Sequence, residues 1–149
     1  HTRTRRQRQM CIRDRYSSIK VFMKDVVEQA KKDKYVSTLY GRKIHVPNIE
    51  SPNYMLRQAS ERAAVNGPLQ GSAADIIKRA MINIFKESGG NEKDIKMILQ
   101  VHDELVFEVP EDYDEKNISY LIDLMEESSS IDVPLKVEYG FGSNWREAH

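Results

Sequence analysis

The spacing of apolar residues predicts an alternation of helices and short strands. Apolar side chains three and four positions apart indicate amphipathic helices, while runs of β-branched and aromatic residues bounded by turn residues indicate strands. By these criteria we expect helices at 17–34, 54–66, 71–88 and 111–130, two short strands within 35–47, and further strands at 95–101, 104–109 and 133–142. Helices combined with an antiparallel hairpin favour an α+β fold.

The predicted break between the second and third helices rests on Gly67 and Pro68. A proline inside a helix removes one backbone hydrogen bond and clashes with the preceding turn. We therefore expect one helix to end near Asn66. The next helix would begin near Ser72, which has an acid, Asp75, three positions on and so resembles an N-cap.

Residues 98–110, ILQVHDELVFEVP, place His102 and Asp103 between two strand-forming runs. A two-residue separation indicates a tight antiparallel hairpin. Side chains alternate faces along a strand, but at a turn the carboxylates of Asp103 and Glu104 can approach one point. Two close carboxylates repel each other unless a cation lies between them, and hard oxygen ligands suit Mg²⁺. This arrangement favours phosphoryl or nucleotidyl transfer, and a solvated turn is the alternative.

A second group of polar residues recurs at four-residue spacing. Arg62, Asn66 and Gln70 would share one face of a helix. Their side chains donate hydrogen bonds of the kind that reach sugars and base edges in a nucleic-acid groove. The minor groove presents acceptors at every base pair, so contacts there would be largely independent of sequence. An exposed polar helix face without a ligand is the alternative.

Length and composition exclude several classes of protein. The 149 residues suffice for one domain with a hydrophobic core. No run of 18 apolar residues is present, and the start lacks the apolar stretch of a secretory signal, so we expect neither a membrane span nor secretion. Cys11 is the single cysteine, which excludes an internal disulfide and fits a reducing compartment.

The first 15 residues differ from the rest in charge and composition. They hold six Arg, no Lys and one acid, whereas residues 16–149 hold 17 basic and 22 acidic residues, a net charge of −5. Arg-rich segments can bind phosphates. The abrupt change at Tyr16 favours instead a foreign or artefactual origin for residues 1–15.

Three stretches together resemble the C-terminal end of family A DNA polymerases of the bacterial polymerase I type. They are ERAAVNGPLQGSAADIIKRAM (61–81), MILQVHDELVFEVP (97–110) and VPLKVEYGFGSNWREAH (133–149), and the likeness covers essentially all of 16–149. The resemblance implies a partial right-hand polymerase fold. Residues 16–50 would be the last part of the fingers, and residues 51–149 the palm.

The resemblance also implies specific roles. Asp103 would bind the catalytic metal, with Glu104 supporting the site, and Arg62, Asn66, Gln70 and His102 would contact DNA near the growing end. Two Mg²⁺ ions would activate the primer 3′-hydroxyl and hold the triphosphate. The partners would be primer–template DNA and deoxynucleoside triphosphates, without a membrane. The full-length enzyme would be a monomer in the bacterial cytoplasm, at the nucleoid, acting in replication and repair.

Several parts of the family pattern are missing from this sequence. The motif with the second metal-binding aspartate, the fingers helix that holds the incoming nucleotide, the thumb and the exonuclease domains are not found. One aspartate cannot hold two ions, so we expect the chain alone to have no polymerase activity. We also expect low stability, because palm strands would be left with open edges.

Two other functions stay open. The chain could be a non-catalytic nucleic-acid-binding module, although a net charge of −5 over residues 16–149 argues against it because backbone binding usually needs a basic surface. The weaker alternative is a metal-dependent phosphoesterase that uses the same two acids.

Overall fold

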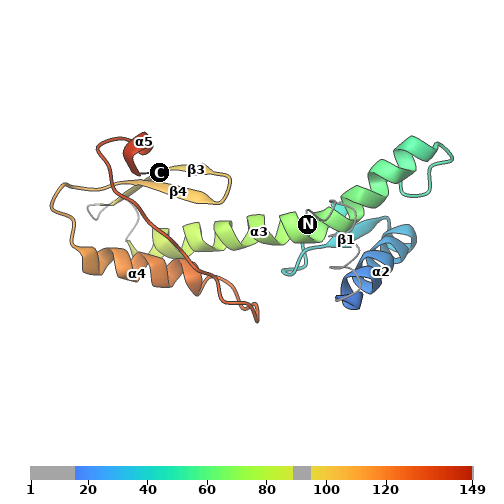
Figure 1. Ribbon diagram of the computed structural model, residues 1–149, viewed down its shortest axis with the longest axis horizontal. Coiled ribbons are helices and arrows are strands. Elements are labelled where there is room, and N and C mark those ends of the chain that lie inside the picture. The colour runs from blue at the N-terminus through green and yellow to red at the C-terminus, as the bar shows by residue number, and fades with distance from the viewer. Residues whose placement is uncertain (1–15, 89–94, 149) are drawn as a thin grey trace, which may run out of the picture. The chain divides into compact units, whose positions relative to one another are not determined.

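The computed structural model describes residues 16–88 and 95–148 (Figure 1). Residues 1–15 and 89–94 lie outside this range. The elements in chain order are α2 (Ser17–Asp33), β1 (Tyr35–Ser37), β2 (Lys43–His45), α3 (Tyr54–Glu87), β3 (Lys96–Val101), β4 (Glu104–Glu108), α4 (Glu115–Glu126) and α5 (Trp145–Ala148). The chain divides into a first unit that ends at Ser72 and a second unit that begins at Ala73. This mixture of helices and antiparallel strands confirms the α+β class.

The first unit is built around a small core beside the β1–β2 hairpin. The two strands pair antiparallel, with Val36 opposite Ile44. The buried core residues come from α2, the hairpin, the loop after it and α3; they are Ala30, Val36, Val46, Ile49 and Ala64. At the end of α2, Lys34 adopts a left-handed conformation (φ 63°) and its amide donates to the Ala30 carbonyl, which directs the chain into β1.

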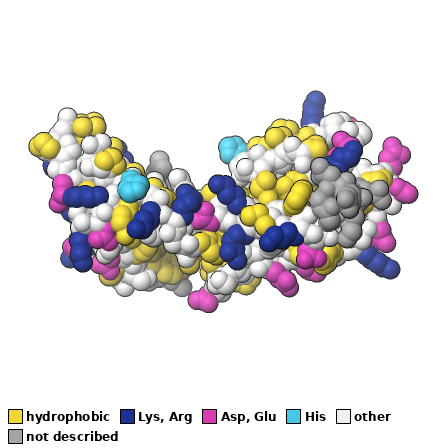
Figure 2. Space-filling model, turned by 180° about the vertical axis from the view of Figure 1, so that it is seen from behind, with side chains coloured by type: hydrophobic (Ala, Val, Ile, Leu, Met, Phe, Trp, Pro, Cys, Tyr) yellow, Lys and Arg dark blue, Asp and Glu magenta, His cyan; other side chains and the backbone are white. Residues whose placement is uncertain are grey.

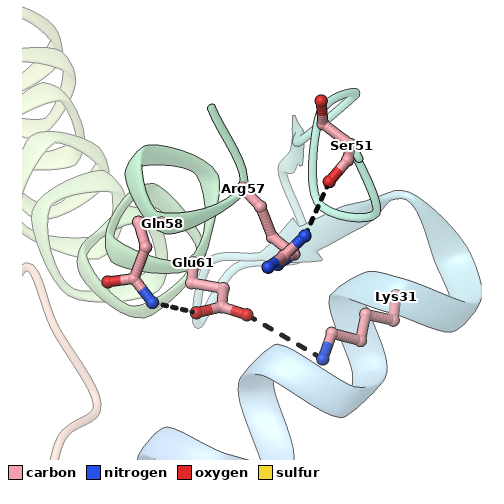
Figure 3. Close-up of polar contacts among 5 residues, drawn as sticks. All are labelled: Lys31, Ser51, Arg57, Gln58 and Glu61. Carbon is pink, nitrogen blue, oxygen red and sulfur yellow. Dashed lines mark hydrogen bonds and ion pairs between the residues drawn. The ribbon is translucent and has the colours of Figure 1, made fainter. Parts of the chain in front are cut away.

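Polar contacts join the start of α3 to α2 and to the preceding loop (Figure 3). The Lys31 ammonium lies 3.9 Å from the Glu61 carboxylate, which also accepts a hydrogen bond from Gln58 at 3.3 Å. Arg57 donates to the carbonyl of Ser51 at 2.9 Å. Partly exposed ion pairs of this kind contribute only about 0.2–1 kcal/mol each, so this one adds little to the packing of α2 on α3.

The predicted break at Gly67-Pro68 is wrong, because α3 continues from Tyr54 to Glu87 with Pro68 inside it (Figure 1). Ser72 is therefore not an N-cap. Its hydroxyl donates to the carbonyl of Pro68 at 2.5 Å and accepts from the amide of Leu39 at 2.9 Å. Contacts with the β1–β2 hairpin thus stabilise the helix at the point where proline weakens it.

The second unit combines the β3–β4 hairpin with α4 and the later part of α3. Its buried apolar residues are Ala80, Ile84, Ile95 and Ile118. Arg79 on α3 donates to the carbonyl of Ser128, just after α4, at 3.1 Å. The helix predicted at 111–130 is shorter in the structure, because Asp114 caps its start by accepting from the Lys116 amide at 2.9 Å.

The strand predicted at 133–142 does not form among the described residues. A strand needs a hydrogen-bonded neighbour, and the amide of Val137 instead donates to the Glu126 side chain at 2.9 Å. On α2 the apolar stripe is only partly buried, since Ile19 and Phe22 are 42% and 39% exposed. Hydrophobic side chains lie open among charged ones on the face shown in Figure 2.

Within residues 16–88 and 95–148, none of the helices combines the length and the apolar character that crossing a membrane requires.

Candidate metal and nucleic-acid site

The β3–β4 hairpin turns tightly at His102 and Asp103, as the sequence predicted. Val101 pairs with Glu104, so only His102 and Asp103 form the loop. His102 has a positive φ of 52°, and two-residue hairpin loops need a positive φ at their first position. For a residue other than glycine this conformation costs roughly 1–2 kcal/mol. The corner is therefore a strained backbone position, of the kind that often occurs at functional sites.

A side chain that sequence reasoning missed supports this corner. The side-chain amide of Gln100 donates from Nε2 to the backbone carbonyl of His102 at 2.6 Å. This bond compensates part of the strain and limits the freedom of the loop that carries Asp103. The position of Gln100 two residues before the turn is the only signal in the sequence that could have indicated this role.

The acids of the hairpin lie in different surroundings. His102 and Asp103 are exposed at the corner, and Glu104 is half-buried at the start of β4. Glu108, at the other end of β4, pairs with Lys96 at 2.9 Å, and this hydrogen bond together with the charge of Glu108 raises the pKa of Lys96. The carboxylate of Glu108 is thus engaged by a lysine, whereas that of Asp103 faces outward from a turn.

The donor set at the corner fits Mg²⁺ in part. Mg²⁺ is commonly held by one or two carboxylates and completes its six positions with water and phosphate oxygens. Asp103 and Glu104 supply two adjacent carboxylates. Across the described residues no cluster of three or more His, Cys, Asp or Glu side chains is placed to hold a metal. The metal-binding role of Asp103 and Glu104 therefore stays a prediction.

The predicted DNA-binding residues of α3 form an exposed stripe. Arg62, Asn66 and Gln70 lie four residues apart on one continuous helix, so they share a face, and all three are exposed. They belong to the first unit, and the corner residues His102, Asp103 and Glu104 to the second. The structure thus groups the predicted site residues into an α3 stripe and a hairpin corner.

Comparisons with known proteins agree with the resemblance seen in the sequence. The family model for DNA polymerase family A matches residues 9–147. DNA polymerase I of Pseudomonas aeruginosa is 48% identical over 138 residues, covering 91% of this chain. The corresponding enzymes of Mycobacterium leprae and Bacillus subtilis are 46% and 41% identical over 134 and 133 residues, covering 90% and 89% of this chain. The chain spans 15% of the length of each of these relatives.

A solved structure shows the same fold. The POL domain of Pol1 from M. smegmatis, in complex with DNA primer-template and dNTP, superimposes with a TM-score of 0.86 at 43% sequence identity. The match covers 91% of this chain and 24% of that one, which confirms a partial polymerase fold. Family model, relatives and structure agree, and the chain therefore belongs to DNA polymerase family A.

Proposed function

We propose that this chain is the part of a DNA-directed DNA polymerase that supplies Asp103 to the metal site and Arg62, Asn66, Gln70 and His102 to the primer–template. The observation that carries the proposal is the tight, supported hairpin corner that presents Asp103. The proposal is also supported by the 43% identity of this family A chain with a polymerase whose structure contains DNA primer-template and dNTP. The parent enzyme would extend a primer 3′-hydroxyl in replication and repair.

Asp103 would hold the catalytic metal directly, and Glu104 would support the site directly or through water. Family A DNA polymerases use divalent metals, and bound Mg²⁺ supplies positive charge against the reacting phosphates. The chain's own contribution is a carboxylate carried on a backbone corner that the two-residue turn and the bond from the Gln100 side chain to the His102 carbonyl hold in place. Because one hairpin provides only part of a two-ion site, we propose that the chain alone does not polymerise.

The α3 stripe would bind the duplex near the growing end. Arg, Asn and Gln donate hydrogen bonds, and the minor groove offers acceptors at every base pair. Charge supports this placement: residues 16–72 hold nine basic and five acidic residues, a net of +4, whereas residues 73–149 hold eight basic and 17 acidic residues, a net of −9. The stripe thus lies on the basic part of the chain, which suits a phosphate backbone.

We also propose the subdomain assignment that the sequence suggested, with residues 16–50 in the fingers and residues 51–149 in the palm. The parent enzyme would act as a monomer in the bacterial cytoplasm.

The test uses a chimera in which residues 16–149 replace the matching segment of the Pseudomonas aeruginosa enzyme. Asp103→Ala should lower primer extension at least about a hundredfold, since removal of one preorganised charge-stabilising group has effects of this size, while primer–template binding is retained. Asp112→Ala, an exposed acid outside the corner, is the matched control and should leave extension unchanged. Extension by Asp103→Ala at a near wild-type rate would refute the proposal.

The same chimera tests the α3 stripe. Arg62→Ala should weaken primer–template binding about tenfold, as loss of a duplex-contacting arginine does. Lys86→Ala removes another exposed base from the same helix and serves as its control. If Arg62→Ala leaves both binding and extension unchanged, the assignment of this stripe is wrong.

A further inference from the structure

The loop between β1 and β2, residues 38–42, contacts α3 on the turn that follows Pro68. The Leu39 amide donates to the Ser72 hydroxyl at 2.9 Å, and the Arg42 guanidinium donates to the Gly71 carbonyl at 3.0 Å. The Ser72 hydroxyl in turn donates to the Pro68 carbonyl at 2.5 Å. Ser72 is buried, so its hydroxyl joins loop and helix away from water.

The 38–42 loop is itself well fixed. Thr38 and Arg42 exchange two hydrogen bonds: the Thr38 amide donates to the Arg42 carbonyl at 3.0 Å, and the Arg42 amide donates to the Thr38 hydroxyl at 3.1 Å. The Gly41 amide donates to the Thr38 carbonyl at 3.0 Å. Because the loop has this internal bonding and Thr38 is buried, it can hold α3 rather than move with it.

The close approach depends on Gly71. A Cβ at this position would lie 2.6 Å from the Thr38 methyl group and 2.9 Å from the Ile44 Cδ1 atom, both too short for carbon–carbon contacts. Only glycine lets the loop lie directly on the helix here. One turn earlier the contact at Gly67 is looser, because a Cβ there would lie 3.1 Å from the Val36 Cγ2 atom.

Pro68 weakens α3 at this turn. Proline has no N–H, so the helical hydrogen bond to the Ala64 carbonyl is lost, and helices bend at such positions. The exposed stripe crosses this point, with Arg62 and Asn66 before it and Gln70 after it. A change in the bend would therefore move Gln70 relative to Arg62 and Asn66.

We propose that the 38–42 loop sets the bend of α3 at Pro68 and thereby places Gln70 in line with Arg62 and Asn66 on the primer–template. Arg42 and Ser72 are then positioning residues, which act on DNA only through the helix. This inference rests on the proposed function of the stripe. It adds that the β1–β2 hairpin, for which the sequence indicated no contact, governs the geometry of the DNA-binding face.

The experiment measures primer–template affinity of the chimera in a double-mutant cycle. Ser72→Ala and Arg42→Ala should each weaken binding about two- to tenfold, the range for loss of one hydrogen bond. In a Gln70→Ala background neither change should cause a further loss, because the residue that they position is gone. Ser72→Thr keeps the hydroxyl and should restore binding. Faster amide exchange at Leu69 and Gln70 in Ser72→Ala should accompany the loss.

Lys43→Ala is the matched control for Arg42→Ala. The Lys43 ammonium lies over the Tyr35 ring, 4.4 Å from the ring centroid. Lys43→Ala removes one positive charge from the hairpin, as Arg42→Ala does. Any effect of Lys43→Ala on affinity should therefore be equal in the wild-type and Gln70→Ala backgrounds. The proposal is overturned if Ser72→Ala leaves affinity unchanged, or weakens it equally in both backgrounds. It is also overturned if Gln70→Ala alone has no effect. Primer extension by the Asp103→Ala chimera tests the proposed catalytic function independently of this result.

Discussion

Replacing Gly71 with alanine tests whether the hairpin lies as close to α3 as the structure shows. Alanine in a helix interior is favoured over glycine by about 1 kcal/mol, so an isolated helix would gain stability. Here the added methyl group would meet Thr38 at 2.6 Å and Ile44 at 2.9 Å. Thr38 is buried and bonded to Arg42, so it cannot turn away cheaply. Overpacking typically costs about 1–3 kcal/mol, and we expect a net loss of about 1 kcal/mol.

Amide hydrogen exchange of the hairpin, residues 35–45, measures this loss as a local opening free energy, without requiring the chain to unfold in one step. Gly67→Ala should have an effect near zero, because its tightest contact is 3.1 Å and offsets the helical gain. Ala63→Gly, at an exposed position of α3, isolates the helix propensity and should leave hairpin exchange unchanged. Equal or slower hairpin exchange in Gly71→Ala would refute the reasoning.

Two further predictions concern the second unit. Asp114→Ala removes the acceptor for the Lys116 amide and should destabilise α4 by about 1 kcal/mol. Amide hydrogen exchange over 115–126 should become faster, and Asp114→Ser should restore most of the protection. Unchanged exchange in Asp114→Ala would contradict the cap. The hydrogen bond to Glu87, together with burial and the charges of Glu87 and Glu127, raises the pKa of Tyr120. The contact therefore stabilises the fold fully at pH values below the ordinary tyrosine pKa of about 10. This stabilisation is lost as the pH rises through the raised pKa of Tyr120. An absorbance titration should show a late tyrosine component that disappears in Tyr120→Phe and returns to the ordinary range in Glu87→Gln, and a late component that persists in Tyr120→Phe would exclude this assignment.

Much of the candidate site follows from local sequence. The two-residue separation of strand-forming runs predicted the hairpin at His102 and Asp103, and the structure has it. Four-residue spacing predicted that Arg62, Asn66 and Gln70 share a face. The first inference depends only on a few neighbouring residues, whereas Gln70 shares the face of Arg62 and Asn66 because α3 continues through Pro68, which the sequence did not predict. The support of the corner by Gln100 was missed, because it depends on the path of the backbone through the turn.

The sequence by itself determined that α2 and the two hairpins form and roughly where they lie, since backbone sterics and side-chain periodicity act over a few residues. Only the tertiary structure decided that α3 passes through Pro68, because the compensating contacts come from Leu39 and Arg42, far away along the chain. It also decided that residues 133–142 form no strand in the described chain. A strand exists only with a hydrogen-bonded neighbour, and the turn of α3 that follows Pro68 is held by hydrogen bonds from the 38–42 loop to Ser72 and Gly71. The pattern of residues along the chain shows neither the neighbouring strand nor these contacts, because they depend on residues that are distant in the sequence.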